Sequence, residues 1–203
     1  EIIDNQYFSD IEAETMRKIF FYSFDEKEKE NFLELSKNNF QEFIKTNKNK
    51  NKAYCFTSGP SFDDYKKIDI DKNSLKVVCN SIIKNEEFLK YIGGADILTF
   101  ADPVFHFGPS EYAETFRKDV INFLEKNEAY AIIPDYNLPL MLQHYPNLSN
   151  KLIGMPALNK DFNFPSIENF YVKGSANILT LFMIPIASTI SNKIWLLSGV
   201  MMF

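Results

Sequence analysis

The stretch Ala53-Tyr-Cys-Phe-Thr-Ser-Gly-Pro-Ser61 decides the fold class, because an apolar strand breaks here into small and polar turn residues. Gly59 allows the backbone to approach a ligand closely, and Pro60 cannot continue a strand. Ser58 and Ser61 place hydroxyl groups beside the free N–H groups of the helix expected next, which suits a phosphate. The turn is therefore a candidate nucleotide-binding site, although the same residues are also ordinary turn composition.

Other short apolar runs of the chain also end in small and polar turn residues. Strands are expected at Ala53–Phe56, Lys76–Cys79, Ile97–Phe100, Ala129–Ile133 and Ile194–Leu197. Short, continuous apolar runs between turn residues are typical of strands that are buried on both faces of a parallel sheet. Ligands of such sheets bind beyond the carboxyl ends of the strands, where the Ser, Asn, Asp and Gly residues of this chain collect.

Segments with helical spacing separate these strands, so the fold class is α/β with a mostly parallel sheet flanked by helices. The clearest helix is expected from Ser110 to Glu125, with Tyr112 and Phe116 on its apolar stripe. A second, buried helix is expected from Ser175 to Ile190. It should bend near Pro185, because proline removes one backbone hydrogen bond and clashes with the preceding turn.

The first fifty residues contain helical patterns without strands, at Ile11–Phe21 and from Asn31 to Ile44. The run Lys45–Lys52 that follows is polar and basic and predicts a solvated linker. A nucleic-acid-binding arm is the alternative, but the run lacks interleaved aromatic residues. We therefore divide the chain into a helical N-terminal extension, residues 1–50, and a sheet domain, residues 51–203. The helices should pack on the edge of the sheet domain or contact another domain or subunit.

Composition narrows the classes of function. The chain has 203 residues, of which 45% are hydrophobic and 24% charged, enough for one sizeable core. The net charge is −5 and the basic residues are spread thinly, which disfavours nucleic acid as a partner. Cys55 and Cys79 lie in expected interior strands, and the lack of a disulfide framework and of a signal peptide predicts a cytoplasmic protein. The longest apolar run, Ile178–Ile186, is far shorter than the roughly 20 residues of a spanning helix.

The last residues are unexpected. Ser198-Gly199 should open a loop at the ligand face, yet the sequence continues only as the apolar Val200-Met-Met-Phe203. Such an end would expose three large side chains, so we expect that the chain that follows Gly199 is absent from this sequence.

Six motifs follow one another in order between Ala53 and Gly199. They are Phe56-Thr-Ser-Gly-Pro-Ser-Phe62, Val77-Val-Cys-Asn80, Phe100-Ala-Asp-Pro103, Pro134-Asp-Tyr-Asn137, Lys173-Gly-Ser-Ala-Asn177 and Ile194-Trp-Leu-Leu-Ser-Gly199. The ordered set resembles the bacterial sialyltransferases of the Campylobacter type and the related DUF115 proteins. The resemblance implies a Rossmann-like GT-A variant that uses no metal or other cofactor. The implied partners are a nucleotide sugar, a CMP-activated nonulosonic acid, and a glycan acceptor.

Carried over residue by residue, the resemblance implies a set of site residues. It assigns Ser58, Gly59, Pro60, Ser61 and Asn80 to the nucleotide, Asp102 and Pro103 to the donor sugar, and Gly174 and Ser175 to the phosphate. Ser58 and Asp102 stand where the family has Asn, which weakens one base or ribose contact and adds a negative charge near an acidic sugar. The donor sugar is therefore expected to differ from sialic acid unless Asp102 binds a hydroxyl group or a cation. In the family, the lid with its tyrosines and catalytic histidine follows the Ser-Gly turn, so we expect it in the chain that is absent from this sequence.

His106, in Asp102-Pro-Val-Phe-His-Phe-Gly108, is our candidate catalytic residue. An imidazole beyond the third strand, with an ordinary pKa near 6.5, could take the proton of an acceptor hydroxyl. The alternative is a structural imidazole that packs between Phe105 and Phe107 and bonds a backbone carbonyl. His144 falls at the end of a short helix, where its charge favours the helix dipole.

No metal site is expected. With two histidines and two cysteines far apart, the sequence has no zinc pattern. Asp69 and Asp71 are expected to be solvated caps at the ends of helices.

Three classes of function remain. The leading one is a metal-independent glycosyltransferase that uses a CMP-activated acidic sugar, with the departing phosphate stabilised by hydroxyl and backbone N–H groups. The second is a DUF115-type pterin pyrophosphokinase, which has an acidic stretch where this chain has Cys79-Asn80-Ser81. The third is a non-catalytic module of a larger glycan or flagellin glycosylation protein. Association with the inner face of the cell membrane and a homo-oligomer remain open.

Overall fold

The computed structural model describes residues 9–59 and 62–197. Its centre is a six-stranded sheet in which every pair of neighbours is parallel, in the order β5-β4-β3-β2-β1-β8. The strands are β1 (Lys52–Phe56), β2 (Leu75–Cys79), β3 (Ile97–Thr99), β4 (Tyr130–Pro134), β5 (Leu152–Met155) and β8 (Lys193–Leu197). The expected α/β class is confirmed, and the five predicted strands are present with shifts of one residue at their ends.

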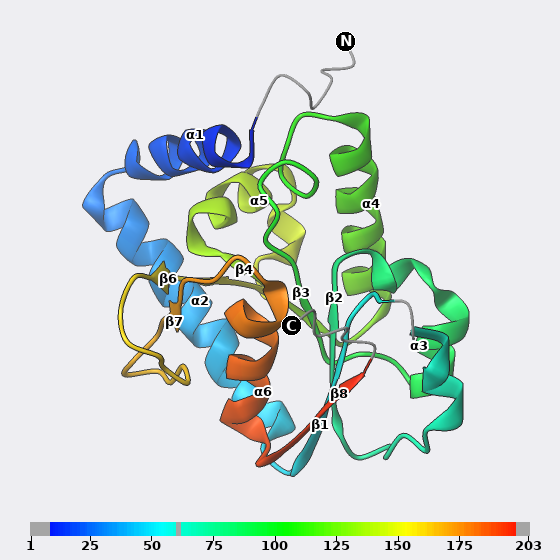
Figure 1. Cartoon of the computed structure of the whole chain (residues 1–203). Coiled ribbons are helices and arrows are strands. Elements are labelled where there is room, and N and C mark those ends of the chain that lie inside the picture. The colour runs from blue at the N-terminus through cyan, green and yellow to red at the C-terminus, as the bar shows by residue number, and fades with distance from the viewer. Residues whose placement is uncertain (1–8, 60–61, 198–203) are drawn as a thin grey trace.

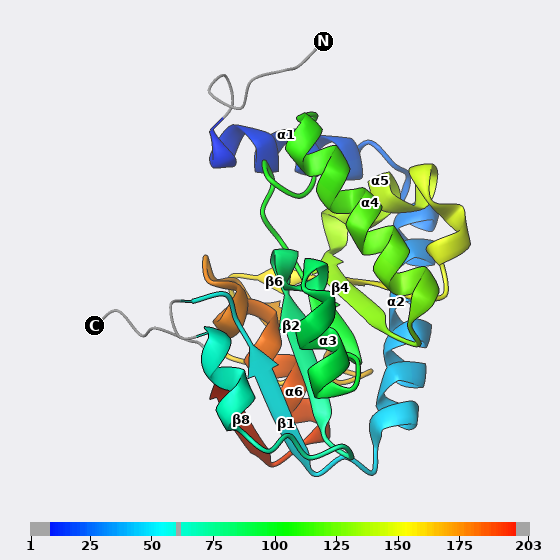
Figure 2. The ribbon, with the colours of Figure 1, turned by 90° about the vertical axis from the view of Figure 1, so that its right-hand side faces the viewer.

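Helices cover both faces of the sheet. They are α1 (Asp10–Tyr22), α2 (Glu26–Asn47), α3 (Glu86–Ile92), α4 (Glu111–Lys126), α5 (Leu138–His144) and α6 (Ile184–Ile190). Figure 1 shows α2 and α6 on one side of the strands, and Figure 2 shows α3 and α4 on the opposite side. Consecutive strands run outward from β1 to β5, and the chain then returns to place β8 on the other side of β1. The carboxyl ends of all six strands therefore meet at one edge.

Shorter elements connect the main ones. They are the 3₁₀ turns η2 (Phe62–Lys67), η3 (Asn80–Lys84), η4 (Asp135–Asn137) and η5 (Pro146–Leu148), the π-helical η6 (Leu179–Met183), and a small parallel pair, β6 (Ala157–Leu158) with β7 (Val172–Lys173). His144 is the last residue of α5, as expected. No helix of the described residues combines the length and apolarity that crossing a membrane requires.

Strand β5 was not predicted, because Leu152-Ile-Gly-Met155 is short and contains a glycine. Its position depends on contacts from distant segments. The hydroxyl of Ser36 on α2 accepts a 3.0 Å hydrogen bond from the N–H of Gly154. A Cβ atom at Gly154 would lie 3.0 Å from the side chain of Leu138 and 3.1 Å from Cα of Asp135, so a larger residue would force these neighbours to shift.

The helical N-terminal segment is confirmed, but α2 shares the core of the sheet. Phe40 and Phe43 are fully buried, and α2 packs against β5. The expected solvated linker is wrong in part. Helix α2 continues to the buried Asn47, and Lys50 forms a 2.5 Å ion pair with Asp96. The run Lys45–Lys52 suggested a solvated linker, but packing of α2 and the carboxylate of Asp96 hold part of it in place.

Helix α4 agrees with its prediction, with the Ser110 hydroxyl as N-cap to the N–H of Ala113. One residue of the stripe was placed wrongly. Ala113, and not Tyr112, joins Phe116 on the buried face, whereas Tyr112 is half exposed. The helix presents its first turn to the ligand edge, and Tyr112 lies on that turn.

The buried C-terminal helix is also confirmed, but it begins later than expected. Before Pro185 the chain forms the π-helical turn η6, in which the N–H of Ile184 bonds the carbonyl of Leu179. Ser175 and Asn177 lie in a preceding turn, where the amide oxygen of Asn177 accepts the N–H of Leu179 at 2.8 Å. The wider turn accommodates the break in the hydrogen-bond ladder that proline imposes.

Cys55 and Cys79 are free thiols in the core, as expected. Burial raises the pKa of Cys55 to about 12 and that of Cys79 to about 11. Both thiols are therefore neutral and pack as small hydrophobic groups. The expectations for Ser198, Gly199 and the chain after them fall outside the described residues.

Candidate functional site

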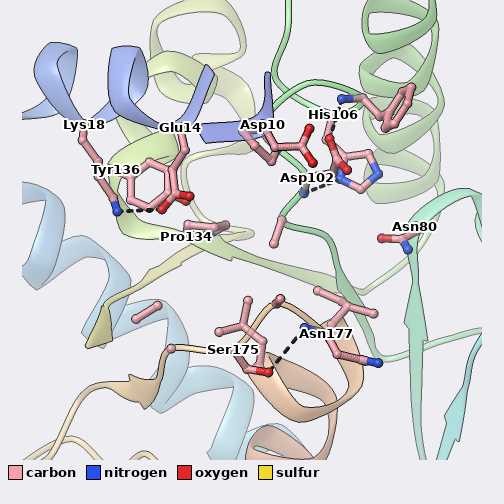
Figure 3. Close-up of a pocket in the computed structure, with 18 of the residues that line it drawn as sticks. Asp10, Glu14, Lys18, Asn80, Asp102, His106, Pro134, Tyr136, Ser175 and Asn177 are labelled. Atoms are coloured by element: carbon pink, nitrogen blue, oxygen red, sulfur yellow. Dashed lines mark hydrogen bonds and ion pairs between the residues drawn. The ribbon is translucent and has the colours of Figure 1, made fainter. Parts of the chain in front are cut away.

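A cavity of about 920 Å³ lies at the carboxyl edge of the sheet. Residues after β1, β2, β3 and β4 form one part of its lining, the turn before η6 forms another, and α1 closes the opposite side. Figure 3 shows the side chains of these segments converging on one space. This is the position at which parallel α/β sheets bind their ligands.

Most of the predicted site residues line this cavity. They are Ser58, Asn80, Asp102, Pro103, His106, Gly174 and Ser175. Gly59 is described but is not part of the lining, and Pro60 and Ser61 fall in the gap in the described residues. The fold thus gathers residues that are more than 100 positions apart in the sequence.

Asn80 follows β2 with a left-handed backbone, at φ 52°. Among the residues that the structure describes, it is the only non-glycine with a positive φ. Asparagine tolerates this region better than most residues, but the conformation still stores strain. Its amide points into the cavity (Figure 3) and forms no hydrogen bond within the described part of the chain. The backbone therefore presents a free amide to a ligand.

The loop after β3 is held in one shape by its own side chains. The carboxylate of Asp102 accepts the N–H groups of Val104 at 2.9 Å and Phe105 at 2.6 Å. The N–H of Asp102 in turn donates to Nδ1 of His106 at 2.9 Å. A Cβ atom at Gly108 would lie 2.3 Å from the carbonyl oxygen of Val104, so the loop closes only with glycine there.

His106 is held as a neutral imidazole. The ring stacks on Phe116 at 4.3 Å and is only 6% exposed. Burial lowers its pKa from 6.5 to about 4. Because Nδ1 accepts an N–H group, the proton of the neutral ring is on Nε2. His106 therefore offers the cavity a hydrogen-bond donor, and no free lone pair.

This geometry bears on both expectations for His106. The structural alternative is right in part, because the buried ring contacts Phe107 edge to face at 6.4 Å. Its closest ring partner is however Phe116, and it accepts an N–H group where a bond to a carbonyl was expected. The role of catalytic base stays a prediction, and the occupied Nδ1 argues against it. A base must accept a proton at the nitrogen that faces the substrate.

Two arginines brace the same loop from outside the cavity. One guanidinium nitrogen of Arg117, on α4, donates to the carbonyls of His106 and Gly108 at 3.0 Å each. Arg17, on α1, donates to the carbonyl of Phe107. Burial, together with the charge of Arg117, lowers the pKa of Arg17. The loop thereby connects α1 to α4 across the carboxyl edge.

Helix α1 supplies a charged wall that the sequence did not reveal. Asp10, Glu14 and Lys18 are spaced by four residues and all line the cavity. Glu14 and Lys18 form a 2.6 Å ion pair, and Lys18 lies 5.4 Å from the ring centre of Tyr136. Burial and the charge of Glu14 raise the pKa of Tyr136. The four-residue spacing was visible in the sequence, but nothing indicated that this face covers the sheet edge.

The turn before η6 forms the wall opposite α1. The Ser175 hydroxyl lies 2.6 Å from that of Thr180 and accepts the N–H of Asn177 at 3.3 Å. Gly174 donates its N–H to the carbonyl of Leu158, which fixes the start of this turn. Hydroxyl and amide groups without formal charge therefore face the acidic residues of α1 (Figure 3).

No group of three or more His, Cys, Asp or Glu side chains that could hold a metal ion occurs within the described ranges. Asp71 instead pairs with Lys52 at 3.3 Å and accepts the N–H of Asn73, so it caps a turn where the end of a helix was expected.

The chain was also compared with known proteins. No protein-family model, no curated protein and no solved structure matches it.

Proposed function

We propose that the chain binds a nucleotide sugar and acts as a metal-independent glycosyltransferase, transferring a CMP-activated acidic sugar to a glycan acceptor. One observation carries the proposal. Ser58, Asn80 and Ser175, which the resemblance to the sialyltransferases assigns to one donor molecule, line one cavity. On this proposal the parallel sheet is a Rossmann-like GT-A variant.

The proposed reaction is a displacement at the anomeric carbon. A hydroxyl oxygen of the acceptor bonds to that carbon, the bond from the carbon to the phosphate oxygen breaks, and CMP leaves with the electron pair. The acceptor proton passes to a base. Donors aimed at the departing phosphate lower the barrier, because charge develops there in the transition state.

The lining offers neutral donors for this phosphate. The Asn80 amide has no hydrogen-bond partner among residues 9–59 and 62–197, the Nε2–H of His106 is held in place by the bond at Nδ1, and the Ser175 hydroxyl faces the same space. We therefore assign His106 to hydrogen-bond donation in preference to proton abstraction. A neutral imidazole can donate to an anion without gaining a proton.

Asp102 requires an explanation, because its charge would repel an acidic donor. Its carboxylate already accepts two backbone N–H groups, which partly offset that charge. Its remaining lone pairs suit a sugar hydroxyl.

The proposal also places the enzyme in the reducing cytoplasm, where the two free thiols are expected.

Isothermal titration calorimetry with CMP tests the proposal. CMP should bind in the presence of EDTA, and Asn80→Ala should weaken binding by about 1–3 kcal/mol, the cost of an unpaired polar group. Asn38→Ala is the matched control, because Asn38 is exposed on α2 and does not line the cavity. Preference for ATP with magnesium over CMP would support the pyrophosphokinase. CMP binding without transfer from any CMP-sugar would support the non-catalytic module.

A further inference from the structure

The cavity is large for a ligand pocket. Its volume of about 920 Å³ is near the upper end of the roughly 300–1,000 Å³ of most ligand pockets. Its two sides also differ in charge. Neutral donors such as Asn80 and Ser175 form one side, and Asp10 and Glu14 form the other. An anionic donor substrate favours the neutral side, which leaves the α1 side for a second molecule.

Two half-exposed aromatic rings, one on the loop after β3 and one on α4, also line the cavity. Phe105 is 48% exposed and Tyr112 is 50% exposed, and both line the cavity. Their rings meet edge to face at 5.7 Å, and Lys84 lies 5.8 Å from the ring centre of Tyr112. Exposed aromatic groups that line a cavity are typical of ligand-binding surfaces.

Hydrogen bonds fix the backbone that carries this aromatic pair. The N–H of Phe105 bonds the carboxylate of Asp102, and Arg117 fixes the carbonyls on either side of the loop end. Tyr112 stands on the first turn of α4, which Ser110 caps. A surface that is ordered before binding loses little entropy when a ligand stacks on it.

Asp10 lines the same cavity and supplies an acceptor for hydroxyl groups. Its carboxylate has no hydrogen-bond or ion-pair partner among the residues that the structure describes, and it points toward Asp102 and His106 in Figure 3. Glu14 is engaged by Lys18. An ionised carboxylate accepts hydrogen bonds from hydroxyl groups and repels anions.

We propose that Phe105, Tyr112 and Asp10 form an acceptor subsite for an uncharged pyranose. The apolar face of the sugar ring stacks on the aromatic pair, and its hydroxyl groups donate to Asp10. The assignment as acceptor subsite rests on the proposed transferase function, whereas binding of the pyranose can be measured without it.

The test is saturation-transfer NMR on the full chain with methyl β-glucopyranoside, methyl β-galactopyranoside and methyl β-glucuronide, with and without CMP. The neutral glycosides should give signals, and the glucuronide should bind about fivefold more weakly, the effect of one nearby like charge in water. Asp10→Asn should reduce this discrimination. Asp161→Asn, an exposed carboxylate outside the cavity, should leave it unchanged.

The substitutions Phe105→Ala and Tyr112→Ala should each weaken the binding of the neutral glycosides by roughly two- to tenfold. Phe162→Ala is the control, because Phe162 is 55% exposed and does not line the cavity. CMP affinity should stay unchanged in all these variants.

Equal glycoside signals in the wild type and in Phe105→Ala overturn the subsite and leave the donor site standing. Weaker CMP binding in Phe105→Ala also overturns it, since the pair then stacks on the base. Failure of CMP to bind the wild type overturns the transferase function alone.

Discussion

The backbone N–H of Asp102 donates a 2.9 Å hydrogen bond to Nδ1 of His106, and this contact decides which nitrogen carries the proton. The ring also lies against Phe116, where the charged form is poorly solvated. The histidine that the sequence singles out is thus a neutral donor at neutral pH.

The first prediction concerns the titration of His106. Its folded pKa of about 4 lies below the ordinary 6.5, so the unfolded chain binds the proton more tightly. The contribution of the neutral His106 ring to the free energy of unfolding is fully present above pH 6.5 and is lost as the pH falls toward 4. The loss should be on the order of 3 kcal/mol. Urea unfolding at pH 7 and pH 4.5 should show it in the wild type and a smaller loss in His106→Gln, whose amide does not titrate.

The second prediction separates a donor from a base at the same position. If Nε2 donates to the departing phosphate, His106→Gln should retain most of the turnover, and His106→Ala should lose more. If His106 is the base, both variants should lose about 10²–10⁴-fold in turnover with CMP affinity nearly unchanged. Normal turnover in His106→Ala would return the residue to a structural role.

The third prediction uses the left-handed backbone of Asn80. Asn80→Gly removes the amide without strain at φ 52°, so the free energy of unfolding should stay equal or rise by up to about 1 kcal/mol. Its CMP affinity should nevertheless fall by about as much as in Asn80→Ala. Calorimetry and urea unfolding of the two variants make the comparison. Undiminished CMP binding by Asn80→Gly would remove the amide from the donor site.

The fourth prediction concerns the brace on the loop after β3. Arg117→Ala leaves the carbonyls of His106 and Gly108 without their donor and should destabilise the fold by about 1–3 kcal/mol. Lys126→Ala, an exposed cation on the same helix, should change stability by less than about 0.5 kcal/mol. Equal urea midpoints for the two variants would contradict the bracing role.

The fifth prediction concerns the edge strand β5. A methyl group at Gly154 meets the backbone of Asp135 and the side chain of Leu138, so Gly154→Ala should destabilise the fold by about 1–3 kcal/mol. Gly174→Ala is the comparison, because its Cβ would meet only the carbonyl of Leu158 at 3.7 Å. Unchanged stability of Gly154→Ala in urea unfolding would show that η4 and α5 shift readily.

The sequence alone determined the parts of the fold that depend on local periodicity. Continuous apolar runs such as Lys76–Cys79 are strands because both faces are buried, and the apolar stripe that includes Phe116 is a helix because its spacing matches 3.6 residues per turn. The gathering of Ser58, Asn80 and Asp102 at one edge also follows from the sequence, since parallel strands end on the same side.

Only the tertiary structure decided which distant groups meet. Arg17 bonds the carbonyl of Phe107 across 90 positions of sequence, and this contact is part of what sets α1 over the cavity. The same holds for the edge strand, where Ser36 bonds Gly154. Local propensity carries no information on such pairs, because each partner is compatible with many neighbours until the whole chain packs. The backbone N–H of Asp102 determines which nitrogen of His106 is protonated, and packing against Phe116 disfavours the charged ring. Both contacts exist only in the folded chain.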